Sequence, residues 1–230
     1  MKNESILCTP GVFDTERLGL FDSRAWPRSE AIGQGGRGSA WFVGDDTGDY
    51  VLRHYRRGGL IGRLNRDLYW FTGTARSRPF LEFRLLDNLH CLGLPVPEPI
   101  AARCVRIGPL YRADLLTRRI PDSETLAEML LRESLDTKQW QSLGWLLKRF
   151  HDAGAYHADL NAHNIMRNSD GQFFLIDFDR GELRKPGDWC ADNLRRLLRS
   201  LNKLAQLHGE QWAGHDDGWQ ALQAAYHGHR

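Results

Sequence analysis

The character of the sequence changes at Ile120-Pro121-Asp122, and this change constrains the fold more than any other feature. Before it, short runs typical of strands alternate with turns, and one stretch has helical spacing. The predicted strands are 30–33, 39–43, 49–55, 101–107 and 111–117, and the predicted helix covers 80–89 and stops at Gly93-Leu94-Pro95. After it, apolar residues recur mainly at helical spacing. A β-rich half followed by a helical half predicts an α+β fold with domains 1–120 and 121–230.

The second half is expected to hold several helices around one small hairpin. Asp122 or Ser123 is expected to cap a short helix that ends near Arg132. The other predicted elements are a helix over 140–150 closed by Ala153-Gly154, a hairpin over 165–176 that turns at 168–171, an amphipathic helix over 194–207 after Pro186-Gly187-Asp188, and a short final helix over 219–226. The hairpin has a loop on each of its sides.

The composition limits the class of protein. The chain has 230 residues, of which 41% are hydrophobic and 26% charged, a balance typical of globular proteins and not of disordered, collagenous or coiled-coil ones. A formal net charge of +2 gives no global field that would indicate nucleic acid. The 4 cysteines form no C-x-x-C pair, which indicates a reducing cytosol and no zinc site. We expect no signal peptide and no membrane-spanning helix, because the apolar runs are too short.

The strongest chemical signal is the segment His157-Ala158-Asp159-Leu160-Asn161-Ala162-His163-Asn164, followed by Asp177-Phe178-Asp179. It resembles the catalytic loop and the metal motif of kinases. Phosphoryl transfer from a nucleotide needs a carboxylate that deprotonates the acceptor hydroxyl, and oxygen ligands that hold Mg²⁺ on the phosphates. Asp159 and His157 are therefore the candidate catalytic residues, and Asn164 and Asp177 are the candidate magnesium ligands. The competing interpretation is that these residues are turns and caps beside a hairpin.

Glycines near the N-terminus match a phosphate-binding pattern. Gly33, Gly35, Gly36 and Gly38 lie in a G-x-G-x-x-G segment, where missing side chains let backbone N–H groups approach phosphates. Taken alone, the segment favours a glycine-rich hairpin turn over a phosphate-binding loop. A strand-like run over 39–43 follows it, whereas a dinucleotide-binding fold would place a helix there. The context therefore favours the flap of a kinase over a Rossmann site.

Arg53 and Glu82 stand where kinases place a lysine and its helical glutamate partner. Arg53 replaces the lysine, and its guanidinium can bridge phosphate oxygens and a carboxylate in a planar fork. We expect both residues to belong to the nucleotide site. The alternatives are an exposed arginine on a strand and a solvated glutamate on a helix.

A basic, partly apolar stretch runs from Arg53 to Arg84. It has eight arginines against Asp67 and Glu82, an excess of six positive charges, and it interleaves aliphatic and aromatic residues such as Trp70 and Phe71. This mixture favours an anionic membrane surface or a phosphorylated amphiphile as partner. An ordinary surface and single-stranded nucleic acid are the other interpretations. We expect no nucleic acid.

The chain as a whole resembles the bacterial lipopolysaccharide-core kinases, specifically the 3-deoxy-D-manno-octulosonic acid (Kdo) kinase family. The resemblance rests on 35–39, 52–60, 93–97, 157–164 and 177–182. It implies a two-lobed protein-kinase-like fold, with a small β-rich N-lobe and a mainly helical C-lobe. It also implies ATP-dependent, Mg²⁺-dependent phosphorylation of the 4-hydroxyl of Kdo on a lipid A precursor. The family's place is the cytoplasmic face of the inner membrane, as a peripheral protein.

Some features depart from kinases in general. Asp179 stands where the metal motif has a glycine, and the short chain after Asp177 leaves little room for a lobe that docks a peptide. A role in the site and simple packing are both open for His163. Two rival functions remain, namely another small-molecule or heptose kinase and a non-catalytic pseudokinase that binds a nucleotide. The presence of Asp159, Asn164 and Asp177 together argues against the pseudokinase.

Overall fold

The computed structural model describes residues 3–12, 19–32, 40–56, 67–208 and 215–228, which form helices and antiparallel sheets. The chain divides into two compact units. The β-rich unit comprises Met1–Asn88 and Pro97–Arg119, and the helical unit comprises Leu89–Val96 and Ile120–Arg230. The mixture of strands and helices predicted from the sequence is confirmed.

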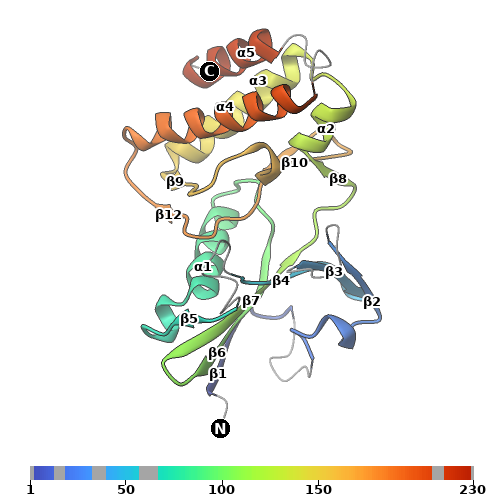
Figure 1. Ribbon diagram of the computed structural model, residues 1–230, viewed down its shortest axis with the longest axis vertical. Helices are drawn as coiled ribbons and strands as arrows, with labels where there is room; N and C mark the ends of the chain where they lie inside the picture. The colour runs from blue at the N-terminus through green and yellow to red at the C-terminus, as the bar shows by residue number, and fades with distance from the viewer. Residues whose placement is uncertain (1–2, 13–18, 33–39, 57–66, 209–214, 229–230) are drawn as a thin grey trace. The chain divides into compact units, whose positions relative to one another are not determined.

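Seven described strands form one antiparallel sheet in the β-rich unit, in the order β1-β6-β7-β4-β3-β2 with β5 also paired to β7 (Figure 1). The strands are β1 (Asn3–Cys8), β2 (Arg28–Ala31), β3 (Ala40–Asp45), β4 (Gly48–His54), β5 (Tyr69–Trp70), β6 (Pro99–Ile107) and β7 (Leu110–Arg118). The five strands predicted from the sequence are present with small shifts of their ends. β1 and β5 were not predicted.

Strand alternation in β4 separates the hydrophobic core from the side that faces helix α1 (Arg78–Cys91). Leu52 is fully buried in a core that the segment 19–26 and strands β3, β4, β6 and β7 build together. The neighbouring Arg53 points to the opposite face, because successive side chains of a strand alternate. There it meets Glu82 of α1.

Helix α1 (Arg78–Cys91) ends where the sequence predicts. Gly93 adopts the left-handed conformation, with φ of 68°. Its N–H donates to the His90 carbonyl, and the next N–H, of Leu94, donates to the Leu89 carbonyl. This pair of bonds is a Schellman motif, which satisfies carbonyls that the helix end leaves without partners.

The helical unit contains α2 (Leu126–Arg132), α3 (Thr137–Asp152), α4 (Trp189–His208) and α5 (His215–His227), with α5 packed along α3 (Figure 1). Its strands are β8 (Ser123–Thr125), β9 (Ala155–Tyr156), β10 (Ile165–Asn168), β11 (Phe173–Leu175) and β12 (Glu182–Leu183). The predicted hairpin over 165–176 is confirmed as β10 and β11. Within the described ranges, none of the helices is both long and apolar enough to cross a bilayer.

The predicted start of α2 was wrong. The N-cap is Thr125 and not Asp122 or Ser123. The Thr125 hydroxyl forms a reciprocal capping box with Glu128. Ser123 instead begins β8, which pairs with β10. Two orphan helix N–H groups are satisfied by the Thr125–Glu128 pair, which explains why the helix starts there.

Helix α3 is followed by strand β9 and then by the loop that begins at His157. It ends at Asp152, and Gly154 has a φ of 75°. A Cβ at Gly154 would lie 2.1 Å from the carbonyl oxygen of Arg184, so the close pairing of β9 with β12 needs a glycine here. The predicted closure of the helix at Ala153-Gly154 is confirmed.

Candidate active site

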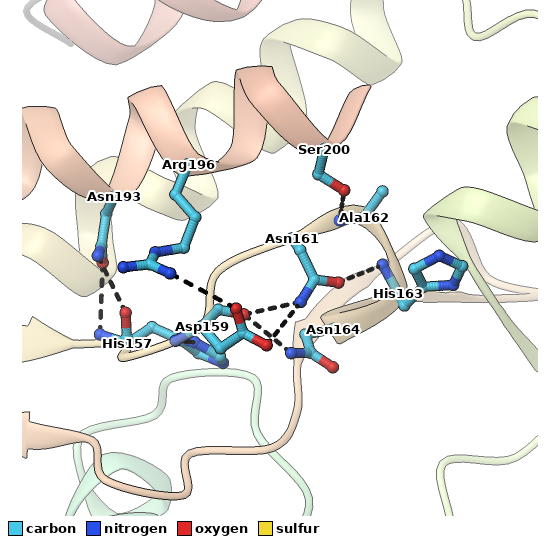
Figure 2. Close-up of polar contacts among 9 residues, drawn as sticks. All are labelled: His157, Asp159, Asn161, Ala162, His163, Asn164, Asn193, Arg196 and Ser200. Atoms are coloured by element: carbon cyan, nitrogen blue, oxygen red, sulfur yellow. Dashed lines mark hydrogen bonds and ion pairs between the residues drawn. The ribbon is translucent and has the colours of Figure 1, made fainter. Parts of the chain in front are cut away.

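The loop after β9 folds on its own polar side chains (Figure 2). The Asn161 and Asn164 side-chain amides each donate to the Asp159 carbonyl at 2.9 Å. Asn161 Oδ1 also accepts from the His163 backbone N–H at 2.8 Å and caps the short 3₁₀ helix η4 (Ala162–Asn164). These bonds order the loop around Asp159. The candidate residues from His157 to Asn164 thus form one compact structure.

His157 supports the loop from inside the helical unit. Its side chain is buried, and its Nδ1 accepts from the Asp159 backbone N–H at 3.1 Å. Its Nε2 lies 2.8 Å from the Ile176 carbonyl oxygen, so Nε2 carries the proton. Burial lowers the pKa of His157 below its usual value, which keeps the ring neutral. These two hydrogen bonds indicate that His157 positions Asp159.

Ile176 brings the second predicted ligand next to the loop. Its N–H donates to the Asn164 carbonyl at 3.0 Å, while its carbonyl accepts from His157. Asp177 follows immediately, in the left-handed conformation with φ of 60°, and its side chain is exposed. The Phe178 ring is fully buried, stacked 5.9 Å from Phe150. The structure therefore places Asn164 and Asp177 on adjoining segments, as the hairpin spacing predicts.

The Asp159 carboxylate is open to a substrate. Its side chain is 69% exposed. Oδ2 accepts from the Asn161 amide at 3.2 Å, and Oδ1 lies 3.7 Å from Nη1 of Arg196. A carboxylate that is oriented by neighbours and still exposed can accept a hydrogen bond from a hydroxyl and take its proton.

One face of α4 supports this loop, and sequence reasoning missed it (Figure 2). Asn193 is buried and binds both sides of the His157 backbone, accepting from N–H at 3.3 Å and donating to C=O at 2.9 Å. Ser200 accepts from the Ala162 N–H at 3.2 Å. Asn193, Arg196 and Ser200 follow helical spacing. This polar stripe beside the leucines of α4 is the signal that could have revealed them.

His163 and Asp179 are the two motif residues whose roles the sequence leaves open. The His163 side chain is exposed, and its ring points away from the Asp159 carboxylate (Figure 2). It therefore does not fill the core, which was one of the two alternatives left open. Asp179 lies in the turn after the buried Phe178.

Arg53 and Glu82 form an ion pair in the β-rich unit. The Glu82 side chain is 2% exposed and that of Arg53 is 23% exposed, so neither is the solvated residue of the competing interpretation. Glu82 also accepts from the Tyr55 hydroxyl, and Arg53 Nη2 donates to that hydroxyl at 3.2 Å. Burial raises the pKa of Tyr55 well above its usual value, so the hydroxyl keeps its proton. Tyr55 was not singled out from the sequence.

The remaining predicted groups are described only in part. Gly33, Gly35, Gly36 and Gly38 lie outside the described residues, as does the segment 57–66 of the basic stretch. The guanidinium of Arg78 lies 4.7 Å from the Tyr69 ring, Arg76 donates to the Thr72 carbonyl, and Arg84 donates to the Ala75 carbonyl. These three arginines thus have local structural contacts.

Comparison with known proteins identifies the family of this chain. A family model described as "Lipopolysaccharide kinase (Kdo/WaaP) family" matches residues 24–226. A protein of Xylella fastidiosa (strain 9a5c) named 3-deoxy-D-manno-octulosonic acid kinase is 50% identical over 200 residues, which are 84% of this chain and 80% of the relative. Proteins of the same name from Stenotrophomonas maltophilia (strain K279a) and Xanthomonas campestris pv. campestris (strain B100) are each 48% identical over the same shares. The chain therefore belongs to the lipopolysaccharide kinase (Kdo/WaaP) family.

Proposed function

We propose that this protein is a Kdo kinase that transfers the γ-phosphoryl group of ATP to the 4-hydroxyl of Kdo on a lipid A precursor. The observation that carries the proposal is the exposed Asp159 carboxylate, held on a kinase-type loop in a member of this family. The two-lobed protein-kinase-like arrangement is part of the proposal. In it, residues 1–120 form the nucleotide lobe and residues 121–230 form the catalytic lobe.

Asp159 acts as the general base. One carboxylate oxygen accepts a hydrogen bond from the acceptor hydroxyl and takes its proton as the sugar oxygen forms its bond to the γ-phosphorus. The bond from phosphorus to the bridging oxygen breaks, and ADP leaves with that electron pair. Asn161 and the His157 ring hold Asp159 in place by the hydrogen bonds described above. His157 contributes by positioning, because both of its ring nitrogens are engaged inside the protein.

Asn164 and Asp177 would hold Mg²⁺, and the donor set fits that ion. The Asn164 side chain is largely buried, its amide nitrogen donates to the Asp159 carbonyl, and its Oδ1 oxygen points away from that carbonyl (Figure 2). The Asp177 side chain is exposed one residue after the Ile176 link. Magnesium prefers oxygen ligands and commonly takes one or two from protein and the rest from phosphates and water. The ion would neutralise charge on the phosphates.

The β-rich unit supplies the nucleotide contacts of the proposal. Arg53 reaches the phosphates while Glu82 and Tyr55 fix its guanidinium. The sequence pattern of Gly33, Gly35, Gly36 and Gly38 predicts that their backbone N–H groups would bind the phosphates. A lysine at position 53 could not reproduce a fork that binds two partners at once.

The lipid acceptor implies attachment to a membrane surface, and one sheet edge suits it. Trp70, Leu110 and Ile107 are paired in register across β5, β7 and β6, so they lie on the same face. Trp70 is 68% exposed and Ile107 is 43% exposed. Arg112 stands two residues from Leu110 on that face; its side chain is 57% exposed and also pairs with Asp67 at 2.7 Å. Exposed aromatic and aliphatic residues beside arginine favour an anionic interface. We infer peripheral binding at the cytoplasmic face of the inner membrane.

Vesicle flotation tests this surface. Trp70→Ser should reduce binding to vesicles that contain anionic lipid, while Trp145→Ser, an exposed tryptophan of α3, is the matched control. Equal binding of the Trp70 variant and the wild type would exclude this edge.

An acceptor panel tests the function and separates its rivals. Purified protein is incubated with ATP, Mg²⁺ and either a Kdo-bearing lipid A precursor, a heptose-bearing acceptor or no acceptor, and each lipid is analysed by mass spectrometry. We expect one added phosphate on the Kdo acceptor alone. Phosphate on the heptose acceptor alone would favour the heptose kinase, and nucleotide binding without any transfer would favour the pseudokinase. Asp177→Asn should weaken Mg²⁺-dependent nucleotide binding in the same preparation.

A further inference from the structure

Arg196 forms a long ion pair with the catalytic carboxylate of Asp159. Its Nη1 lies 3.7 Å from Asp159 Oδ1, too far for a hydrogen bond, and its side chain is 42% exposed. Its Nε is buried and has no hydrogen-bond partner among the described residues. One terminal nitrogen of the guanidinium, Nη1, is directed toward the Asp159 carboxylate (Figure 2).

The loop is held without Arg196. Asn193 and Ser200, on the same face of α4, bind the backbone of the loop, and Asn161 orients the Asp159 carboxylate. The neighbouring Arg195 is exposed and pairs with Asp192 on its own helix. Arg196 therefore differs from Arg195 in that its charge is directed to the site.

The acceptor named for the relatives is an acid, which explains why a positive charge stands at Arg196. The relatives act, by name, on an octulosonic acid, and such an acid carries a carboxylate on the same sugar skeleton as its hydroxyls. When Asp159 binds a hydroxyl of this sugar, the acid group comes close to a second negative charge. Like charges at this range repel, and a cation beside both of them removes the penalty.

We propose that Arg196 binds the carboxylate of the acceptor sugar and makes the enzyme selective for acidic sugars. The proposal rests on the proposed function. The planar guanidinium matches a carboxylate with two parallel N–H donors. The same group lessens the repulsion between Asp159 and the acid, so it raises affinity for the acidic acceptor and not for a neutral one.

The test compares two acceptors with three variants. The acceptors are the Kdo-bearing lipid A precursor and the same lipid with the Kdo carboxylate converted to a carboxamide. The variants are Arg196→Gln, Arg196→Lys and the matched control Arg195→Gln. Wild-type protein should prefer the acid by about 10- to 100-fold in kcat/KM. Arg196→Gln should lose this preference through a raised KM for the acid, with KM for ATP unchanged. Arg196→Lys should recover part of it, and Arg195→Gln should keep all of it.

Other outcomes overturn the proposal in distinguishable ways. Equal loss of kcat/KM for both acceptors in Arg196→Gln would mean that the residue serves phosphoryl transfer or the loop. Equal use of the acid and the carboxamide by wild-type protein refutes the subsite without any variant, so a folding defect cannot hide the result. Failure of wild-type protein to phosphorylate either acceptor would overturn the proposed function, and the subsite with it.

Discussion

Replacing Asn193 by alanine should destabilise the protein and loosen its catalytic loop. The Asn193 side chain is buried, and it satisfies both the N–H and the C=O of His157. Alanine leaves these two backbone groups without partners in the interior, at about 1–3 kcal/mol each. The better helix propensity of alanine returns about 0.5 kcal/mol, and water that enters the vacated space limits the loss. We therefore expect the free energy of unfolding to fall by about 2–3 kcal/mol.

Urea unfolding followed by circular dichroism measures this change, and Asn202→Ala is the matched control. Asn202 is exposed on the same helix, so its replacement brings the same gain in helix propensity without removing a buried partner. The control should be neutral or slightly stabilising. A loss below about 0.5 kcal/mol for Asn193→Ala would refute the reasoning, since unpaired buried backbone groups cost more than that.

Three further changes probe other parts of the molecule. Glu82→Gln leaves the guanidinium of Arg53 without its carboxylate, and it should lower the free energy of unfolding by about 2–3 kcal/mol in urea; an unchanged midpoint would contradict this. Burial lowers the pKa of His151 to about 4 in the folded protein. The unfolded chain therefore binds a proton more readily than the folded one. The stability that this group contributes above about pH 6.5 is lost as the pH falls toward 4. His151→Gln should flatten the pH dependence of the free energy of unfolding, by at most about 3 kcal/mol between about pH 6.5 and 4. An unfolding profile identical to that of the wild type would exclude the assignment. Gly144→Ala would place a Cβ 2.3 Å from the Leu222 carbonyl oxygen, so the melting temperature should fall despite better helix propensity; a raised one would show that α5 can move away.

The parts of the fold that the sequence predicts well have strong local signals. Helix α1 stops at Gly93 because a left-handed residue ends it, and glycine adopts that conformation at little cost. The hairpin of β10 and β11 follows from a turn between two apolar runs. Both features are decided by residues close together in the chain.

The missed elements depend on partners that are distant in sequence. Strand β1 is an edge strand whose residues are mostly exposed or half-buried, and backbone pairing with β6 holds it. Edge strands need no clear alternation of apolar residues. The start of α2 was different, because Thr125 and Glu128 show the S/T-x-x-E pattern of a capping box in the sequence itself. That signal was present and was overlooked.

The candidate site shows the same division. The order and spacing of Asp159, Asn164 and Asp177 predict a kinase loop, and the structure brings their segments together. The spacing could not reveal that Asn193 and Arg196 approach from α4, because tertiary packing alone joins that helix to the loop. The leucines of α4 dominate its pattern and hide the polar stripe.

Single-turnover phosphoryl transfer by Asp159→Asn tests the central claim most directly. Excess enzyme is mixed with labelled ATP, Mg²⁺ and the Kdo-bearing lipid A precursor, and nucleotide affinity is measured on the same sample. Asparagine keeps the shape and the contact with Asn161 but cannot take the proton of the acceptor hydroxyl. We predict that transfer slows by about 10²- to 10⁴-fold while nucleotide affinity stays within a few-fold of wild type. Transfer at the wild-type rate would contradict the assignment of Asp159 as the general base.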